Sequence, residues 1–220
     1  MKRIVLLGMI TMYLVRHGQT EENLQRIFQG HLPGVLTEEG RKQAVDLGPQ
    51  LENLSLDAVV SSDLQRVIDT VLLAFGSQAC DSLDGDDLLW DDYGRTQLVD
   101  GQTQLVKNDR FLMHRGRKIP WETTQLLREI DWGSWTGLLV SSVDASRLPV
   151  DAESKEMLYE RAGRFLDYLK KNYDGKTVLV VAHGLVNRSI QAQIEGVEVD
   201  RLYDVTHMKN AEVRKFVWYT

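Results

Sequence analysis

Runs of apolar, β-branched residues alternate along the chain with segments of helical periodicity. The runs at residues 12–15, 58–60 and 178–181 are almost wholly apolar, which predicts strands buried on both faces of a sheet. Apolar residues at spacings of three and four predict helices, and a final apolar run predicts a closing strand. The helices span Thr37 to Leu51 with Thr37 as the N-cap, Leu64 to Phe75, Lys155 to Tyr173 and Leu185 to Ile194, and the closing strand spans Val213 to Tyr219. Strands that alternate with helices indicate an α/β fold with three layers, α/β/α, around a mainly parallel central sheet.

The stretch from Gly76 to Gln125 interrupts this alternation. It begins with an acidic segment at residues 81–92, which is typical of a solvated loop and lacks the ligand order of a calcium site. Residues 96–99 and 102–106 alternate on either side of an Asp-Gly pair, which predicts a hairpin. We therefore expect a single domain over residues 1–220 with an inserted, hairpin-containing segment at 76–125, a candidate lid or homodimer contact.

Composition excludes several classes of protein. With 220 residues, 43% of them hydrophobic, the chain can bury one sizeable core. A net charge of -6 disfavours a general nucleic-acid surface, although arginines can still gather in one cleft that handles anions. The single Cys80 excludes an internal disulfide framework, and no apolar run approaches the length that spans a membrane. The basic start and the short apolar run at 4–7 resemble a signal peptide, but the run reads equally well as a strand and no small-residue cleavage site follows it. We therefore expect a cytoplasmic protein without nucleic-acid or membrane partners.

Two of the predicted buried strands end in a histidine followed by a glycine. His17 comes shortly after residues 12–15, and His183 comes shortly after residues 178–181. Ligands bind at the carboxyl ends of parallel strands, so both histidines are expected at one edge of the sheet. A single histidine at a strand end is usually structural or solvated, but the coincidence of two favours a functional site.

Two arginines are expected at the same edge. Arg16 precedes the first histidine, and Arg66 lies in the first turn of the helix after residues 58–60. Guanidinium groups match phosphate oxygens, so the set predicts a phosphate clamp, with a surface ion pair as the alternative for each arginine. A metal site is the competing interpretation. It is disfavoured because neither histidine has a second ligand at metal-binding spacing, and an adjacent guanidinium would repel a divalent cation. We expect no metal and no other cofactor.

At these residues the chain resembles the histidine phosphatase superfamily, which includes the cofactor-dependent phosphoglycerate mutases. Several segments carry the resemblance, in the family's order. They are Arg16-His17-Gly18-Gln19-Thr20 with Asn23, Phe28-Gln29-Gly30, Leu36-Thr37 with Gly40, Ser61 to Thr70, Arg128 to Gly137, and Val181 to Gly184. The resemblance covers about residues 11–195 and the closing strand, but not the segment at 76–125 or the first ten residues.

The resemblance implies a role for each matching position. The catalytic set is His17 as the nucleophile, Arg16, Arg66 and His183 as the phosphate-holding core, and Glu129 as the proton donor. The substrate-binding set is Asn23, Gln29 and Gly30 in the pocket, and the backbone of Gly184 beside the phosphate. For this chemistry His17 must attack as a neutral imidazole, with its other ring nitrogen held by a backbone carbonyl. Glu129 must protonate the leaving oxygen and then act as a base toward water. Thr136 stands where the family commonly has a glutamate.

The remaining aromatic and histidine residues match no catalytic position. Trp132 and Trp135 are expected to be packing residues. His31, His114 and His207 are expected to be surface or structural residues, with His114 and Arg115 as further candidates for substrate contacts.

Hydrolysis and mutase chemistry both use a phosphohistidine, so spacing has to separate them. Mutases of the family have a long insertion between the acid and the second histidine, whereas Glu129 and His183 are only 54 positions apart here. This spacing favours a phosphoric monoester hydrolase that acts on a small phosphorylated metabolite. Phosphoglycerate mutase-type transfer is the alternative. An inactive phosphate- or protein-binding module is a third hypothesis, which is disfavoured because both the nucleophile and the acid are retained.

Overall fold

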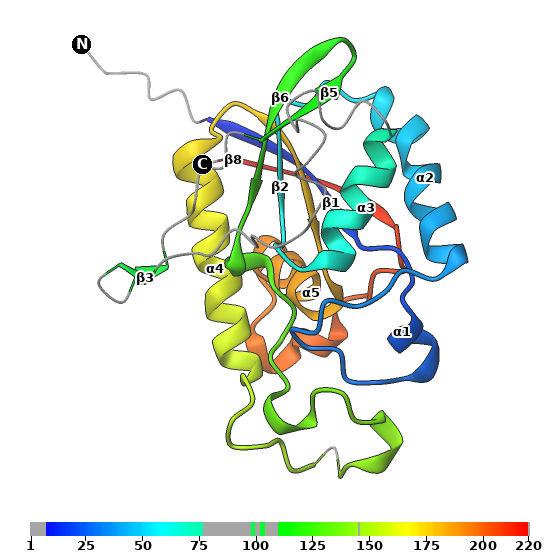
Figure 1. Ribbon diagram of the computed structural model, residues 1–220. Coiled ribbons are helices and arrows are strands. Elements are labelled where there is room, and N and C mark those ends of the chain that lie inside the picture. Colours follow the sequence, from blue (N-terminus) through cyan, green and yellow to red (C-terminus); the bar gives the residue numbers. More distant parts are fainter. Residues whose placement is uncertain (1–7, 77–97, 100–101, 104–109, 145, 220) are drawn as a thin grey trace, which may run out of the picture.

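A mainly parallel sheet of six strands is the centre of the computed structural model, which describes residues 8–76, 98–99, 102–103, 110–144 and 146–219 (Figure 1). The strand order is β5-β6-β2-β7-β1-β8. The bounds are Met9–Arg16 for β1, Ala58–Ser61 for β2, Arg110–His114 for β5, Arg117–Thr123 for β6, Thr177–Ala182 for β7 and Val213–Tyr219 for β8. The four inner strands run parallel, and the edge strands β5 and β8 are antiparallel to their neighbours. The carboxyl ends of β1, β2, β6 and β7 therefore share one edge.

Helices cover both faces of this sheet, which confirms the predicted three-layer α/β/α class. Figure 1 shows α2 and α3 on one face and α4 and α5 on the other. These helices span Glu38–Glu52, Gln65–Phe75, Lys155–Asn172 and Gly184–Ile194, in that order. The connections hold a short α1 at Glu21–Gln25 and 3-10 segments η2 at Gln125–Leu127, η3 at Gly133–Trp135, η4 at Val140–Ser142 and η5 at Val199–Asp204.

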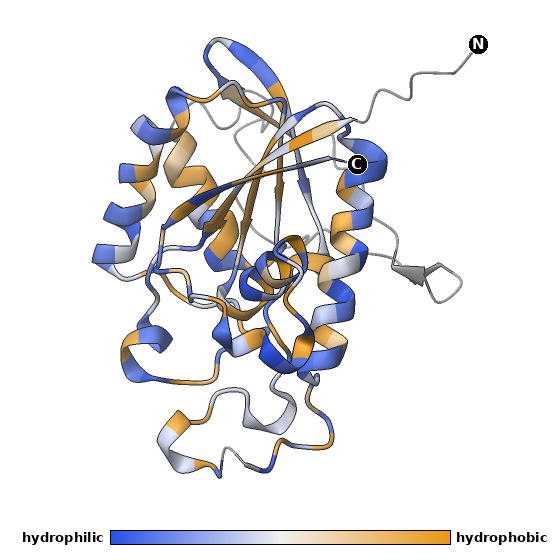
Figure 2. Ribbon diagram, turned by 180° about the vertical axis from the view of Figure 1, so that it is seen from behind, coloured by the Kyte–Doolittle hydropathy of each residue, from blue (hydrophilic) through white to orange (hydrophobic). Residues whose placement is uncertain are grey.

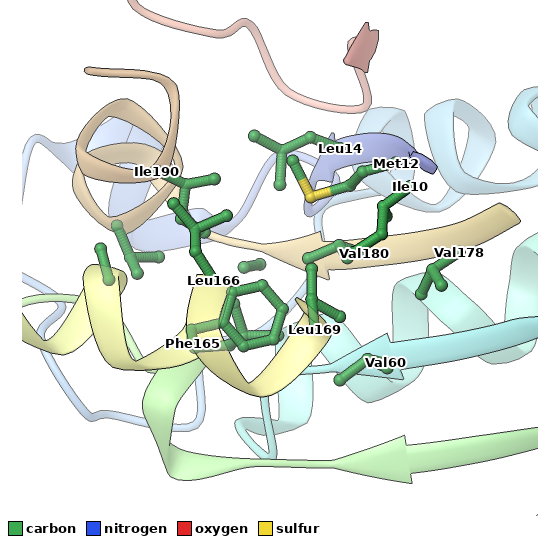
Figure 3. Packing of buried hydrophobic residues seen from close by; sticks show 14 of the residues in the cluster. Ile10, Met12, Leu14, Val60, Phe165, Leu166, Leu169, Val178, Val180 and Ile190 are labelled. Carbon is green, nitrogen blue, oxygen red and sulfur yellow. The ribbon is translucent and has the colours of Figure 1, made fainter. Parts of the chain in front are cut away.

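Most side chains on both faces of β1, β2 and β7 are buried, which explains why these strands read as apolar runs. On one face, Met12 and Val180 pack with Phe165 of α4 and Ile190 of α5 (Figure 3). On the other face, residues of β1, β2 and β7 pack against α2 and α3. Figure 2 shows that the helices turn hydrophobic residues toward the sheet and hydrophilic residues toward the outside. The apolar core therefore packs against both faces of the strands whose ends carry His17 and His183.

The start of α2 determines the path of the chain just after β1. Thr37 caps this helix as predicted, because its hydroxyl oxygen accepts from the N–H of Gly40 at 2.9 Å. A Cβ on Gly40 would lie 1.9 Å from the carbonyl oxygen of Gln19, and one on Gly18 would lie 2.4 Å from the carbonyl oxygen of Gly40. Only glycine permits this contact between backbones.

The stretch expected as an insertion over residues 76–125 has two described parts. Within it β3, Leu98–Val99, pairs antiparallel with β4, Gln102–Thr103, as predicted for the hairpin. The Asp-Gly pair at 100–101, expected as the turn, and the acidic segment at 81–92 lie outside the described residues. The last part differs from the expectation, because β5 and β6 belong to the central sheet and β6 pairs with β2. A role as a lid or homodimer contact stays a prediction.

No helix in the described residues is both long enough and apolar enough to cross a membrane.

Candidate active site

Two histidines from different strands lie together at the carboxyl edge of the sheet. β1 and β7 pair in parallel with Arg16 opposite Ala182, so His17 and His183 leave the two strands at the same level. Their ring centroids are 5.2 Å apart, and the two residues are 2% and 0% exposed. The structure thus brings together the two histidines that the sequence placed at strand ends.

The hydrogen bonds of His17 define which ring nitrogen is free. Its Nδ1 lies 2.7 Å from the carbonyl oxygen of Gly18, and a carbonyl can only accept, so Nδ1 carries the proton. Nε2 therefore keeps an unshared electron pair. Burial, followed by the charges of Arg66 and Arg16, holds the pKa of His17 well below its usual value. The imidazole is neutral at neutral pH, the state in which it can act as a nucleophile.

The loop after His17 is anchored on both sides. The N–H of Gly18 donates to the hydroxyl of Thr70 in α3 at 3.1 Å. The side-chain amide of Asn210 donates to the carbonyl oxygen of His17 at 3.0 Å, and this amide also donates to the Oδ1 of Asn23 at 3.3 Å. The imidazole is therefore presented by a backbone that is held in place.

Two guanidinium groups flank the histidines with donors that are not fully used. Arg66, which is fully buried, donates from Nη2 to the carbonyl oxygen of Gly30 at 3.0 Å and from Nη1 to that of Leu32. Arg16 donates from Nη1 to the carbonyl oxygen of Met208 at 2.8 Å. The Nε atoms of both arginines are buried and have no hydrogen-bond partner within the described residues. Burial lowers the pKa of Arg66 to about 10, so it stays charged at neutral pH.

His183 adds a third nitrogen of this kind. Its Nε2 lies 2.8 Å from the hydroxyl of Ser62, which follows β2, while its Nδ1 is buried without a partner in the described part of the chain. Burial and the charge of Arg66 hold the pKa of His183 well below its usual value. An unpaired buried polar group costs about 1–3 kcal/mol. The unused guanidinium nitrogens of Arg16 and Arg66, together with Nδ1 of His183 when the Ser62 hydroxyl donates to Nε2, are suited to an anion with several oxygens.

Glu129 occupies the N-terminus of α5. Its carboxylate oxygens accept from the backbone N–H groups of Leu185 at 3.1 and 3.2 Å and of Val186 at 3.2 Å. A Cβ on Gly184 would lie 3.4 Å from Oε2 of Glu129 and 3.6 Å from Nε of Arg16. Gly184 thus lies between the carboxylate and a guanidinium, at ordinary contact distance from both, while a side chain there would clash with Cε1 of His207 at 2.8 Å.

The loop that carries Glu129 is held by an arginine of α4 that the sequence motifs did not indicate. Nη1 of Arg161 donates to the carbonyl oxygens of Leu126 at 2.9 Å and Arg128 at 2.7 Å, and its Nη2 donates to that of Glu129 at 3.3 Å. Arg161 also forms an ion pair with Glu153 at 2.7 Å. A signal was present, because Arg161 interrupts the buried face of an amphipathic helix between Leu158 and Phe165.

The predicted pocket residues form a network beside the histidines. Asn23 completes a capping box with Thr20 at the start of α1, and its Nδ2 donates to Oε1 of Gln29 at 3.4 Å. Nε2 of Gln29 donates to a carboxylate oxygen of Glu22 at 2.7 Å. Gly30, with a φ of 48°, contributes the carbonyl oxygen that accepts from the buried arginine described above. These residues therefore belong to the connection between β1 and α2, which contacts Arg66.

The three other histidines lie in different places relative to the site. His207 lies in the site, because Arg16 donates to its Nε2 at 2.9 Å, so the expectation of a surface or merely structural residue understates it. His31 lies 2.9 Å through Nε2 from the carbonyl oxygen of Glu129. His114, whose Nε2 donates to the carbonyl oxygen of Leu54 at 2.8 Å, lies at the opposite edge, because β5 runs antiparallel to β6.

Arg115 accompanies His114 at that edge, so neither residue contacts the site. The two tryptophans pack as expected, since the rings of Trp132 and Trp135 lie 4.7 and 5.3 Å from the ring of Phe28. Across the described residues, no cluster of three or more histidine, cysteine, aspartate or glutamate side chains is arranged to hold a metal ion.

Comparison with known proteins gives a consistent result. A sequence profile of the histidine phosphatase superfamily (branch 1) matches residues 12–97 and 111–220. Phosphoserine phosphatase 1 of Hydrogenobacter thermophilus is 27% identical over 226 residues, covering 91% of this chain and 88% of that protein. The probable phosphoglycerate mutase GpmB of Salmonella arizonae is 30% identical over 188 residues, covering 86% of this chain and 76% of that protein.

A solved structure supports the same architecture. The alpha-ribazole phosphatase of Shigella flexneri superposes with a TM-score of 0.70 over 93% of this chain and 89% of that chain. The two sequences are 19% identical, so this likeness concerns the fold.

Proposed function

We propose that the chain, which belongs to the histidine phosphatase superfamily (branch 1), is a phosphomonoesterase that hydrolyses a small phosphorylated metabolite through a phosphohistidine, without a metal ion. The observation that carries the proposal is the hydrogen bond from Nδ1 of His17 to the carbonyl oxygen of Gly18 at 2.7 Å. It leaves Nε2 as a nucleophile beside two guanidinium groups. Those cations favour a phosphate dianion at this point and disfavour a divalent metal ion.

In the first step, Nε2 of His17 attacks phosphorus while the bond from phosphorus to the ester oxygen breaks. The carboxyl group of Glu129, protonated for this step, gives its proton to the departing oxygen, so an alcohol leaves. Arg16, Arg66 and His183 stabilise the three equatorial oxygens of the transferring group, a task of positioning and electrostatics. The products of this step are the alcohol, the phosphohistidine and the carboxylate of Glu129.

In the second step, a water molecule attacks the phosphorus of the phosphohistidine. The carboxylate of Glu129 takes the proton from this water as the nitrogen–phosphorus bond breaks. Inorganic phosphate leaves, and His17 and the protonated carboxyl group are regenerated. The same pair of residues thus serves both half-reactions.

The names of the relatives suggest two possible acceptors of the phosphoryl group, water and a second hydroxyl group. Phosphoserine phosphatase 1 is named for hydrolysis, whereas GpmB is named as a probable mutase, in which the phosphoryl group passes to a second hydroxyl. The interval of 54 positions between Glu129 and His183 leaves little chain to close over the pocket, which favours water as the acceptor. Mutase-type transfer is the second candidate.

A single labelling experiment tests the common intermediate. The wild-type chain is incubated with a ³²P-labelled phosphomonoester, quenched, and examined for label that is stable in base and labile in acid. We expect such label in the wild type and none in His17→Asn. A folded wild-type chain that acquires no label and releases no phosphate from a broad panel of phosphomonoesters would indicate a binding module instead.

The acceptor and the metal requirement are tested by turnover. The panel includes interconversion of 2- and 3-phosphoglycerate, and each assay is repeated after exhaustive chelation. Phosphate release that survives chelation supports the hydrolase. Isomerised phosphoglycerate in excess of free phosphate would assign the mutase, and loss of all turnover on chelation would contradict the metal-free mechanism.

A further inference from the structure

His207 lies at the rim of the site and contacts its first arginine. Nη1 of Arg16 donates to Nε2 of His207 at 2.9 Å and to the carbonyl oxygen of Met208 at 2.8 Å. Two consecutive residues of the segment before β8 thus hold one nitrogen of the guanidinium. The Nε of the same group is buried with no partner in the described residues, so it remains for a phosphate oxygen.

This contact requires a particular charge state of the imidazole. A guanidinium nitrogen can only donate, so Nε2 of His207 must accept with its electron pair, and the ring must be neutral with its proton on Nδ1. A protonated ring has no acceptor. It would instead place a second cation beside Arg16 and abolish the hydrogen bond that orients it.

The backbone segment that carries His207 is held in position. Arg214 donates to the carbonyl oxygens of Thr206 at 2.9 Å and of His207 at 3.2 Å, which ties this segment to β8. On its other side, a Cβ on Gly184 would lie 2.8 Å from Cε1 of His207. The exposed imidazole therefore lies between Gly184, at the start of α5, and Arg16.

The charges around His207 favour its neutral form. Arg16 of β1, Arg188 of α5 and Arg214 of β8 face it, against a single carboxylate from Glu129. Burial and these cations lower the pKa of His207 from its usual value, and Glu129 opposes the shift. At neutral pH the acceptor is available, and it is lost as the pH falls through the lowered pKa.

We infer that His207 is a positioning residue that orients Arg16 for phosphoryl binding only while its ring is neutral, so that affinity for phosphate weakens on acidification. This inference rests on the proposed phosphate site, but it does not depend on turnover. It adds to the active site a residue that no motif indicates, and it gives the site a built-in response to pH.

The test compares His207→Gln, which keeps an acceptor but cannot titrate, with His207→Ala, which keeps neither. Affinity for inorganic phosphate is measured by calorimetry from pH 8 to pH 5, together with the melting temperature of each variant. Lys209→Ala, which removes an exposed cation from the same segment, is the matched control. Dividing the wild-type affinity by that of His207→Gln at each pH removes the titration of phosphate and of all other groups.

We expect this ratio to stay constant near pH 8 and to fall on acidification, by up to about tenfold, the worth of one hydrogen bond to a charged group. At pH 8, His207→Ala should bind phosphate about tenfold more weakly than the wild type, and His207→Gln and Lys209→Ala within about threefold of it. A ratio that is flat or rises toward pH 5, or wild-type affinity in a folded His207→Ala, would overturn the inference. Because phosphate binding is read without turnover, absence of catalysis would count against the proposed function alone.

Discussion

Buried histidines lie at both edges of the sheet, but their surroundings differ. At the carboxyl edge, His17 and His183 lie beside two arginines whose Nε atoms are buried and have no partner in the described residues. At the opposite edge, His114 is 3% exposed and donates to the carbonyl oxygen of Leu54, beside the ring of Phe75. Burial alone therefore does not mark a chemical site. What distinguishes the carboxyl edge is a set of charged donors with unused hydrogen-bonding capacity.

Replacing the nucleophile should give the largest difference between the two edges. His17→Asn removes the nitrogen that we propose attacks phosphorus, so we expect kcat to fall by about 10⁴-fold or more and the phosphoenzyme to disappear. His114→Asn at the other edge should keep kcat/KM within about twofold. Steady-state kinetics on one phosphomonoester check both. Equal losses of activity in the two variants would mean that the carboxyl edge does not hold the active site.

The acid should show a smaller and substrate-dependent effect. Glu129→Gln cannot supply a proton to the leaving oxygen, so kcat/KM for an alkyl phosphate should fall by about 10²- to 10⁴-fold. For 4-nitrophenyl phosphate, whose leaving group departs without a proton, the fall should be much smaller. The ratio of the two losses is the measurement. A ratio near one would remove Glu129 from the role of general acid.

His114 should matter for stability. His114→Asn leaves the partly buried carbonyl oxygen of Leu54 without its donor, so we expect the free energy of unfolding to fall by about 1 kcal/mol or more. Urea denaturation measures this loss. Arg115→Ala, which removes an exposed neighbour on the same hairpin, serves as the control and should change little. Unchanged stability in His114→Asn would contradict the structural role given to this edge.

The free energy of unfolding should fall progressively as the pH is lowered. His17 and His183 have a pKa well below 6.5 in the folded chain and near 6.5 in the unfolded chain, so the unfolded state binds more protons below that pH. Their contribution is complete above pH 6.5 and is lost as the pH falls toward the folded pKa, at about 1.4 kcal/mol per pH unit for each ring.

Thermal or urea unfolding of the wild type and His183→Asn from pH 7.5 to pH 5 tests this dependence. The free energy of unfolding should depend less steeply on pH in the variant, by about half of what His17 and His183 together contribute. His31 and His207, whose pKa is also lowered, contribute equally to the pH dependence of both proteins. Identical slopes would mean that His183 is not held neutral by its surroundings.

Much of this architecture could be predicted from local pattern. The runs that became β1, β2 and β7 are buried on both faces, and the helices at residues 38–52, 65–75, 155–172 and 184–194 match the predicted periodic segments within one or two residues. The stretch at 110–123 was harder. Its strands β5 and β6 join the sheet beside β2, although they follow a hairpin signal that suggested a separate insertion. Local pattern identifies a strand but not the sheet that accepts it.

The candidate site likewise contains residues that the sequence could identify and residues that it could not. Arg16, His17 and His183 were identifiable because each lies directly at a strand end, and parallel pairing brings such ends together. The roles of Arg161 and His207 were not, because their partners are the carbonyl oxygens of a distant loop and a guanidinium 191 positions away, although Arg161 stood out on the buried face of its helix. Residue types and spacing by themselves determined the fold class and indicated the candidate reacting groups, whose roles the family resemblance implied. Only the tertiary structure decided which side chains orient them, because orientation depends on contacts between segments that local sequence does not encode.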